Sequence, residues 1–142
     1  MIRYGHFMKN YIHHIVVTVS NAKSSREWYK KALGWEITEE GRDYVYLVPD
    51  SKKYPGGKFM LVLGEPRDNV PLGNNFDRNK IGLDHFAFNV DTIEELKDVE
   101  KRLKEVGIEM ENNGITDDDF GGTAIFCIDP DGMKVEFHLY EE

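Results

Sequence analysis

Two segments of this chain, lying 71 positions apart, have the residue pattern of the same β-strand. Residues 11–20 (YIHHIVVTVS) align with residues 82–91 (GLDHFAFNVD), and the alignment places His14 on His85. A helical pattern and three strand-like runs follow each segment, in the same order. Any α+β domain can show such a rhythm, but matched order in both halves favours a duplication. We therefore expect two similar units joined through a shared core.

The first unit is predicted over about residues 11–65. A β-branched strand at residues 12–19 precedes a helix whose capping box is Ser24 with Glu27 and whose end is Gly34. Strands are expected at residues 35–38, 44–48 and 58–63.

The second unit is predicted over about residues 82–142, after a Pro/Gly-rich linker at about 66–81. Its strand at 83–90 leads to a helix that begins with the capping box Thr92 and Glu95 and ends before Gly107. Strands are expected at 108–111, 123–128 and 133–139. Residues 1–142 thus form a single domain of two units.

Composition narrows the classes of function. The net charge is −8, and no cluster of basic residues interrupts the acidic balance, so nucleic acid and anionic membranes are disfavoured as partners. No apolar run approaches the length of a membrane span, and the first residues lack a signal-peptide core. The single cysteine, Cys127, lies in an apolar run, which predicts a buried, inert thiol. A soluble cytoplasmic protein is expected.

Alternation along the strands places candidate metal ligands on common faces. His14 shares a face with Val16 and Thr18, opposite an aliphatic face that suits packing under the helix. His85 likewise lies on the face of its strand opposite Phe86, Phe88 and Val90. On the last strand, Glu136 shares a face with His138.

If the two units form one curved sheet, His14, His85 and Glu136 could converge in its concavity. Two imidazoles and a carboxylate suit Mn²⁺, Fe²⁺, Co²⁺, Ni²⁺ or Zn²⁺. Three protein ligands leave coordination positions of the ion open for water or substrate, which favours a catalytic over a structural metal site. The alternative is that Glu136 pairs with a basic side chain.

Four further residues bear on this candidate site. Aligning the last strands of the two units puts Met60 where symmetry would call for a second carboxylate. His138 is either a proton shuttle, a hydrogen-bond partner of Glu136, or simply exposed. His13 is expected on the opposite face from His14, and His6 has no counterpart in the second unit.

Two further features have simple interpretations. Tyr44 and Tyr46 share a face and could line a pocket or only pack. The acidic loop at residues 117–122 is most simply a solvated surface.

These motifs resemble the vicinal oxygen chelate superfamily, which includes glyoxalase I, bleomycin-resistance proteins, fosfomycin-modifying enzymes, methylmalonyl-CoA epimerase and extradiol dioxygenases. The similarity covers about residues 11–140. It rests on the first strand, followed by Trp28-Tyr29 and Leu33-Gly34, on residues 83–88 (LDHFAF) and on residues 129–136 (DPDGMKVE). The last motif is the most specific, because its tight turn sets the position of Glu136 along the strand.

The resemblance implies tandem βαβββ modules in an incomplete eight-stranded barrel. It also implies a divalent metal held by His14, His85 and Glu136, and a homodimer. The family's chemistry is bidentate chelation of substrate oxygens by that metal. Met60 stands where glyoxalase I and the epimerases carry a fourth ligand, which counts against those activities.

We therefore expect a metal-dependent enzyme acting on a small oxygen-rich substrate, with a small ring-cleaving dioxygenase as one form of it. A glyoxalase-like lyase or isomerase, a fosfomycin-type transferase, and a metal-free protein that sequesters a drug or metabolite are the alternatives.

Overall fold

The computed structural model describes residues 12–50, 59–68, 74–118 and 121–140. The elements, in chain order, are β1 (His14–Thr18), α1 (Ala22–Leu33), β2 (Glu36–Glu40), β3 (Tyr44–Val48), β4 (Met60–Gly64), β5 (His85–Asn89), α2 (Ile93–Glu105), the 3-10 turn η1 (Glu111–Asn113), β6 (Thr116–Asp117), β7 (Gly122–Ile128) and β8 (Lys134–Tyr140).

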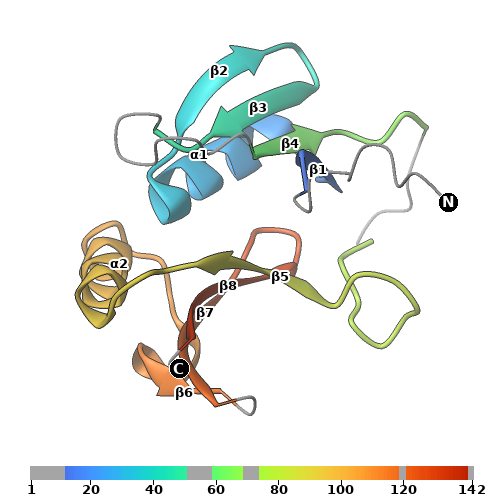
Figure 1. Cartoon of the computed structure of the whole chain (residues 1–142). Helices are drawn as coiled ribbons and strands as arrows, with labels where there is room; N and C mark the ends of the chain where they lie inside the picture. The colour runs from blue at the N-terminus through green and yellow to red at the C-terminus, as the bar shows by residue number, and fades with distance from the viewer. Residues whose placement is uncertain (1–11, 51–58, 69–73, 119–120, 141–142) are drawn as a thin grey trace, which may run out of the picture.

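The strands form two sheets of four strands each, one from each half of the chain. The strand orders are β1-β4-β3-β2 and β5-β8-β7-β6, so the topology is the same in both halves. In each sheet the first strand runs parallel to its neighbour, and the other pairs are antiparallel. The sheets lie one above the other, and no described strand of one pairs with the other (Figure 1). The predicted fold of two βαβββ modules is confirmed, with the eight strands in two four-stranded sheets that are not closed into a barrel.

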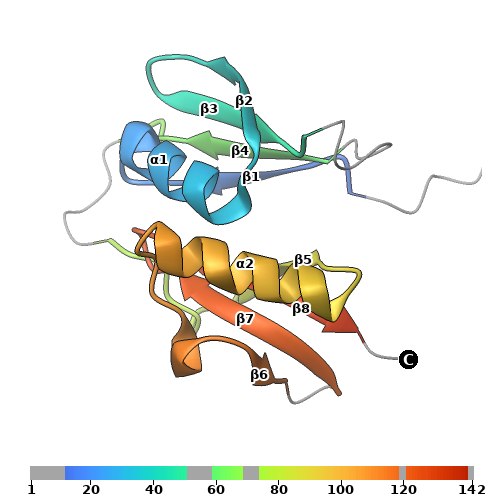
Figure 2. The same ribbon diagram turned by 90° about the vertical axis from the view of Figure 1, so that its left-hand side faces the viewer.

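The two helices lie side by side, and each covers one face of its own sheet (Figure 2). Apolar residues of both halves merge into one core, in which Tyr29, Leu61, Leu96 and Val135 are fully buried. The Arg102 guanidinium of α2 also donates a hydrogen bond of 2.8 Å to the Ala32 carbonyl of α1. The halves therefore pack through their helices and through ring contacts of Phe88 in β5 with Trp35 and Phe59 of the first half, which leaves the opposite face of each sheet open.

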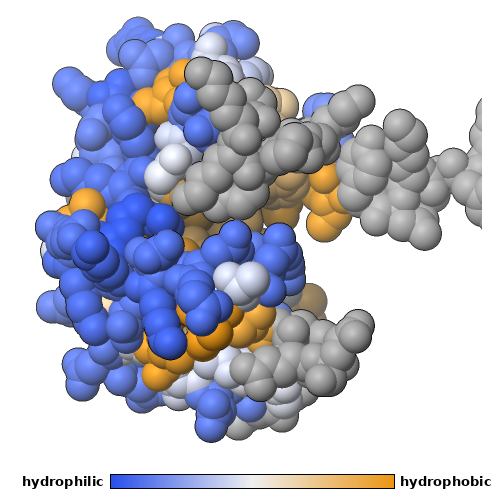
Figure 3. Space-filling view, turned by 60° about the vertical axis from the view of Figure 1, so that its left-hand side comes forward, coloured by the Kyte–Doolittle hydropathy of each residue, from blue (hydrophilic) through white to orange (hydrophobic). Residues whose placement is uncertain are grey.

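The surface on the helical side is mainly hydrophilic, with small hydrophobic patches (Figure 3). Neither described helix is long and apolar enough to cross a membrane.

The structure corrects the predicted start of the first helix. Asn21 is its N-cap, with the Asn21 side chain accepting from the Ser24 backbone N–H, so α1 begins earlier than the Ser24 capping box implied. Asn and Ser are comparable N-caps, and the pattern alone could not rank them. The predicted end is correct, because Gly34 adopts the left-handed conformation (φ 67°) that closes helices. In the second half, Thr92 caps α2 as predicted.

The predicted strand at residues 108–111 is wrong. Only Met110 makes an isolated bridge, to Cys127, and η1 follows it. The short edge strand β6 lies instead at Thr116–Asp117. Asn112 and Asn113 have positive φ values, which turn the chain after this single bridge to β7, and pairing resumes only at β6.

A turn between β7 and β8 ties the two halves together. Asp129 is 4% exposed, and its carboxylate accepts hydrogen bonds from the Tyr29 hydroxyl of α1 (2.8 Å) and from the backbone N–H groups of Asp131 and Met133. Burial raises the pKa of Asp129, and these donors oppose that rise. Asp131 in turn accepts from the Ser20 backbone N–H. The turn that sets the start of β8 is thus anchored to the first module.

Removing the Tyr29 hydroxyl should weaken this anchor. We expect Tyr29→Phe to lower the free energy of unfolding by about 1.5–3 kcal/mol, the usual contribution of a hydrogen bond to a charged group. Urea denaturation measures it. The control is Tyr44→Phe, which removes an exposed hydrogen bond to Glu39 and should change stability by less than about 0.5 kcal/mol. Equal effects in the two variants would contradict the anchoring role.

Candidate functional site

The side chains of β8 divide as the alternation predicted. Val135, Phe137 and Leu139 are buried in the core. Glu136 and His138 lie on the other face, away from α2. Glu136 is nevertheless only 6% exposed, so a carboxylate is buried on the open face of the second sheet. Such a group requires partners.

One partner is His85, on the neighbouring strand β5. Its Nε2 lies 3.0 Å from Glu136 Oε2, and its Nδ1 lies 2.6 Å from Asp84 Oδ1. The bond with His85 lowers the pKa of Asp84, which stays ionised at neutral pH. The structure therefore brings together two of the three predicted ligands.

The arrangement around His85 fits a cation between Nε2 and Glu136. A neutral imidazole carries one N–H and can donate to one of its two carboxylate neighbours only. With that proton on Nδ1, facing Asp84, the Nε2 lone pair faces a carboxylate oxygen, an arrangement that a cation or a second proton stabilises. Two ligand atoms about 2.1 Å from one ion, at about 90–109°, lie about 3.0–3.4 Å apart. A carboxylate behind a ligating histidine is also common in metal sites.

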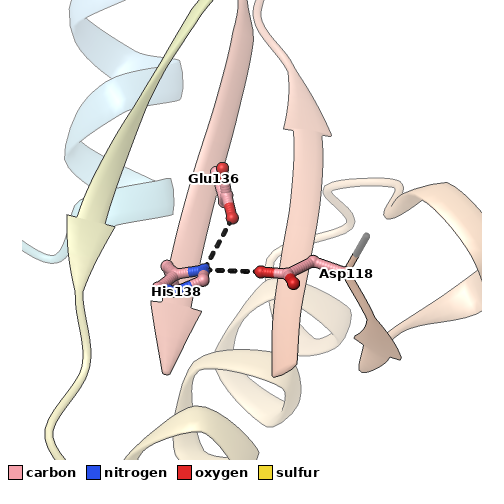
Figure 4. A group of neighbouring side chains, drawn as sticks. All are labelled: Asp118, Glu136 and His138. Carbon is pink, nitrogen blue, oxygen red and sulfur yellow. Dashed lines mark hydrogen bonds and ion pairs between the residues drawn. The ribbon is translucent and has the colours of Figure 1, made fainter. Parts of the chain in front are cut away.

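The second partner of Glu136 is His138. His138 Nδ1 lies 2.9 Å from Glu136 Oε1 and 3.0 Å from Asp118 Oδ2 (Figure 4). The candidate ligand atoms of these three residues all lie within 4.8 Å of one another, a spacing that could hold a metal ion.

Asp118 was not singled out by the sequence. The prediction that loop 117–122 is a solvated surface is wrong at this residue, because the Asp118 side chain is only 5% exposed. A charge run without periodicity gives no sign of which member turns inward. Residues 119–120 lie outside the described residues.

These side chains line a cavity of about 590 Å³, a volume typical of small-molecule sites. Its charged lining is predominantly acidic, with carboxylates at Asp84, Glu111, Asp117, Asp118 and Glu136, and cations at Arg78 and Lys134. Lys134 is paired with Glu111 at 2.7 Å and lies over the Phe126 ring. The lining therefore favours cations and neutral polar ligands over anions.

His14 lies elsewhere, on the open face of the first sheet. It is exposed at the start of β1, its Nδ1 is 2.8 Å from His13 Nδ1, and it is not among the described residues that line the cavity. Val16, on the same face, is 59% exposed, whereas Val17 is buried. The predicted division of β1 into an open and a packed face is correct. His6 lies outside the described residues.

The strand register corrects the predicted counterpart of Glu136. His14 pairs with Met60 across β1 and β4, but His85 pairs with Lys134 across β5 and β8, and Glu136 pairs with Ala87. The residue of the first sheet that matches Glu136 is therefore Val62, opposite Val16, and Met60 matches Lys134. Loop lengths differ between the halves, so aligning the last strands by sequence slipped by two positions. Neither Met60 nor Val62 supplies a carboxylate.

Cys127 is buried in β7, as predicted, and burial raises the pKa of its thiol to about 12. Because thiolate is the reactive form, we expect no alkylation of the folded protein by iodoacetamide at pH 8 and stoichiometric alkylation in denaturant. Mass spectrometry measures both. Rapid labelling of the native protein would contradict this packing.

Comparison with known proteins agrees with this architecture. The family model described as Glyoxalase/Bleomycin resistance protein/Dioxygenase superfamily matches residues 11–137. The chain belongs to this superfamily.

Among curated relatives, biphenyl-2,3-diol 1,2-dioxygenase 2 of Rhodococcus globerulus is 27% identical over 129 residues, covering 89% of this chain. The chain spans only 60% of that relative's length. The trivalent organoarsenical cleaving enzyme of Bacillus sp. (strain MD1) is 30% identical, covering 87% of this chain and 70% of the relative. Metallothiol transferase FosB of Staphylococcus epidermidis is 29% identical, with 89% and 80% covered.

Among solved structures, a glyoxylase/bleomycin resistance protein/dioxygenase domain from Frankia sp. EAN1pec superposes with a TM-score of 0.74 at 25% identity, covering 95% of both chains. The relatives carry out different reactions, so membership fixes the fold and leaves the reaction open.

Proposed function

We propose that the chain is a cytoplasmic metal-dependent enzyme whose divalent ion is held by His85 and Glu136. The observation that carries the proposal is the 3.0 Å separation of His85 Nε2 and Glu136 Oε2 at the wall of the acidic cavity. Asp84 orients His85, and His138 contacts the other oxygen of Glu136. When bound, the ion supplies Lewis acidity or a site for oxygen activation. Fe²⁺, Mn²⁺, Ni²⁺, Zn²⁺ and Co²⁺ all suit these ligands.

Changing Glu136 tests the assignment. Glu136→Gln should weaken metal binding by more than about 100-fold, since a ligand contributes at least as much as the groups behind it, with little loss of folding. Metal content after purification and titration with Co²⁺ measure this. The matched control is Glu111→Gln, which removes a negative charge from the same cavity. If Glu136→Gln keeps its metal, the ligand assignment is wrong.

We propose that the third ligand is His14 of a second copy of the chain, in a homodimer. His14 is exposed on the open face of the first sheet, together with the largely exposed Val16, and the same face carries the paired rings of Tyr44 and Tyr46. The open face of the second sheet carries His85 and Glu136. Covering one open face with the other would bury this apolar surface and bring the imidazole to the cavity.

Mixing two inactive variants tests the shared site. His14→Ala and Glu136→Gln homodimers should both bind metal poorly. Refolded together in equal amounts, about half of the dimers are mixed, and each mixed dimer has one intact site, so about a quarter of all sites should recover. If each site lies within one chain, every site in the mixture carries a substitution and none recovers.

For the reaction, we propose oxygen-dependent cleavage of a small aromatic diol. Its support is the similarity to the biphenyl-diol dioxygenase across 89% of this chain, together with an acidic cavity that suits a neutral diol better than a phosphonate anion. The Fe²⁺-loaded protein should consume oxygen with biphenyl-2,3-diol, as measured by an oxygen electrode. Inactivity towards diols, combined with thiol addition to fosfomycin by the Mn²⁺- or Ni²⁺-loaded protein, would assign transferase chemistry instead.

A further inference from the structure

Asp118, just beyond β6, exchanges two hydrogen bonds with Gly122. The Asp118 backbone N–H donates to the Gly122 carbonyl at 2.9 Å, and the Gly122 N–H donates back to Asp118 Oδ1 at 2.8 Å. The side chain is 5% exposed. One carboxylate oxygen is thus fixed by the backbone, and the other, Oδ2, is directed at His138.

The contacts of His138 favour one tautomer of its ring. Both neighbours of Nδ1, Asp118 Oδ2 and Glu136 Oε1, are carboxylate oxygens. Between two ionised carboxylates this nitrogen can only donate, so the geometry fits the His138 tautomer that carries its proton on Nδ1. Asp118 therefore selects the tautomer that donates to Glu136.

The space for the imidazole depends on Gly122. A Cβ atom there would lie 2.7 Å from His138 Cε1 and 3.0 Å from Asp118 Oδ2. No side chain larger than hydrogen fits without displacing the ring. The glycine thus provides both the backbone contacts that hold Asp118 and the space that His138 occupies.

Glu136 is in this way oriented from both ends, with Oε1 facing His138 and Oε2 facing His85. We propose that Asp118 is a positioning residue for the metal site: through His138 it turns the Glu136 carboxylate so that Oε2 points to His85. This inference rests on the proposed function, because it concerns the same site.

The test compares Asp118→Asn with Asp43→Asn in the full-length protein, using Co²⁺ as the probe. An amide has one accepting oxygen and cannot accept from both Gly122 and His138. Asp118→Asn should weaken Co²⁺ binding by about 10–100-fold, the usual effect of groups behind a ligand, and shift the visible spectrum of the bound ion. Asp43 is exposed in the first module and does not line the cavity, so its variant should bind within about threefold of wild type.

A double-mutant cycle separates this role from a general effect on folding. In a His138→Ala background, Asp118→Asn should have little further effect on Co²⁺ affinity, because the path to Glu136 is already lost.

Additive losses would overturn the inference. An unchanged affinity and spectrum in Asp118→Asn, even with a lower melting temperature, would overturn it as well. Complete loss of binding, matching Glu136→Gln, would also overturn it by making Asp118 a ligand. If wild type binds no Co²⁺, the proposed metal site itself fails.

Discussion

A buried carboxylate between two imidazoles is the interaction on which the site depends. Glu136 is 6% exposed, on the side of its sheet that faces away from the helix. Removing an ionised carboxylate from water is unfavourable by several kcal/mol unless it is paired and hydrogen-bonded. Here each oxygen has one imidazole nitrogen within about 3 Å. Such pairing keeps the anion in place and gives one oxygen a definite direction.

The fold maintains this position through contacts remote from the cavity. β8 enters from the turn at Asp129, which is bonded to Tyr29 of the other module, and its alternate residues are fixed in the shared core. A residue at the centre of β8 therefore has little freedom to move along or around the strand. The modules meet through their helices, the turn at Asp129 and the aromatic contacts of Phe88, and both open faces remain available. This geometry explains why His85 and Glu136 meet within one chain, while His14 lies on a separate surface.

Much of this could be predicted from sequence. The period-2 alternation of β1, β5 and β8 is strict, since one face of each strand packs in the core, and it assigned His14, His85, Glu136 and His138 to the correct faces. The match between the two halves gave the strand–helix order. The register of the strand pairs was harder to predict from the sequence. The loops before the last strands differ in length between the halves, so Met60 was matched to Glu136 where the hydrogen-bonded register matches Val62.

The burial of Asp118 could not be predicted from the sequence for a different reason. It follows from two reciprocal hydrogen bonds with Gly122, which leave no periodic pattern in the sequence. The edge strand β6 was likewise displaced from residues 108–111, because two asparagines with positive φ redirect the chain. Irregular backbone of this kind is determined by individual side chains and tertiary contacts.

Anomalous diffraction from crystals grown with Co²⁺, recorded at the cobalt edge, would test the central claim most directly. The account predicts a peak within about 2.3 Å of both His85 Nε2 and Glu136 Oε2. A peak bound instead between Asp118 and His138, or no peak near Glu136 at saturating Co²⁺, would contradict it.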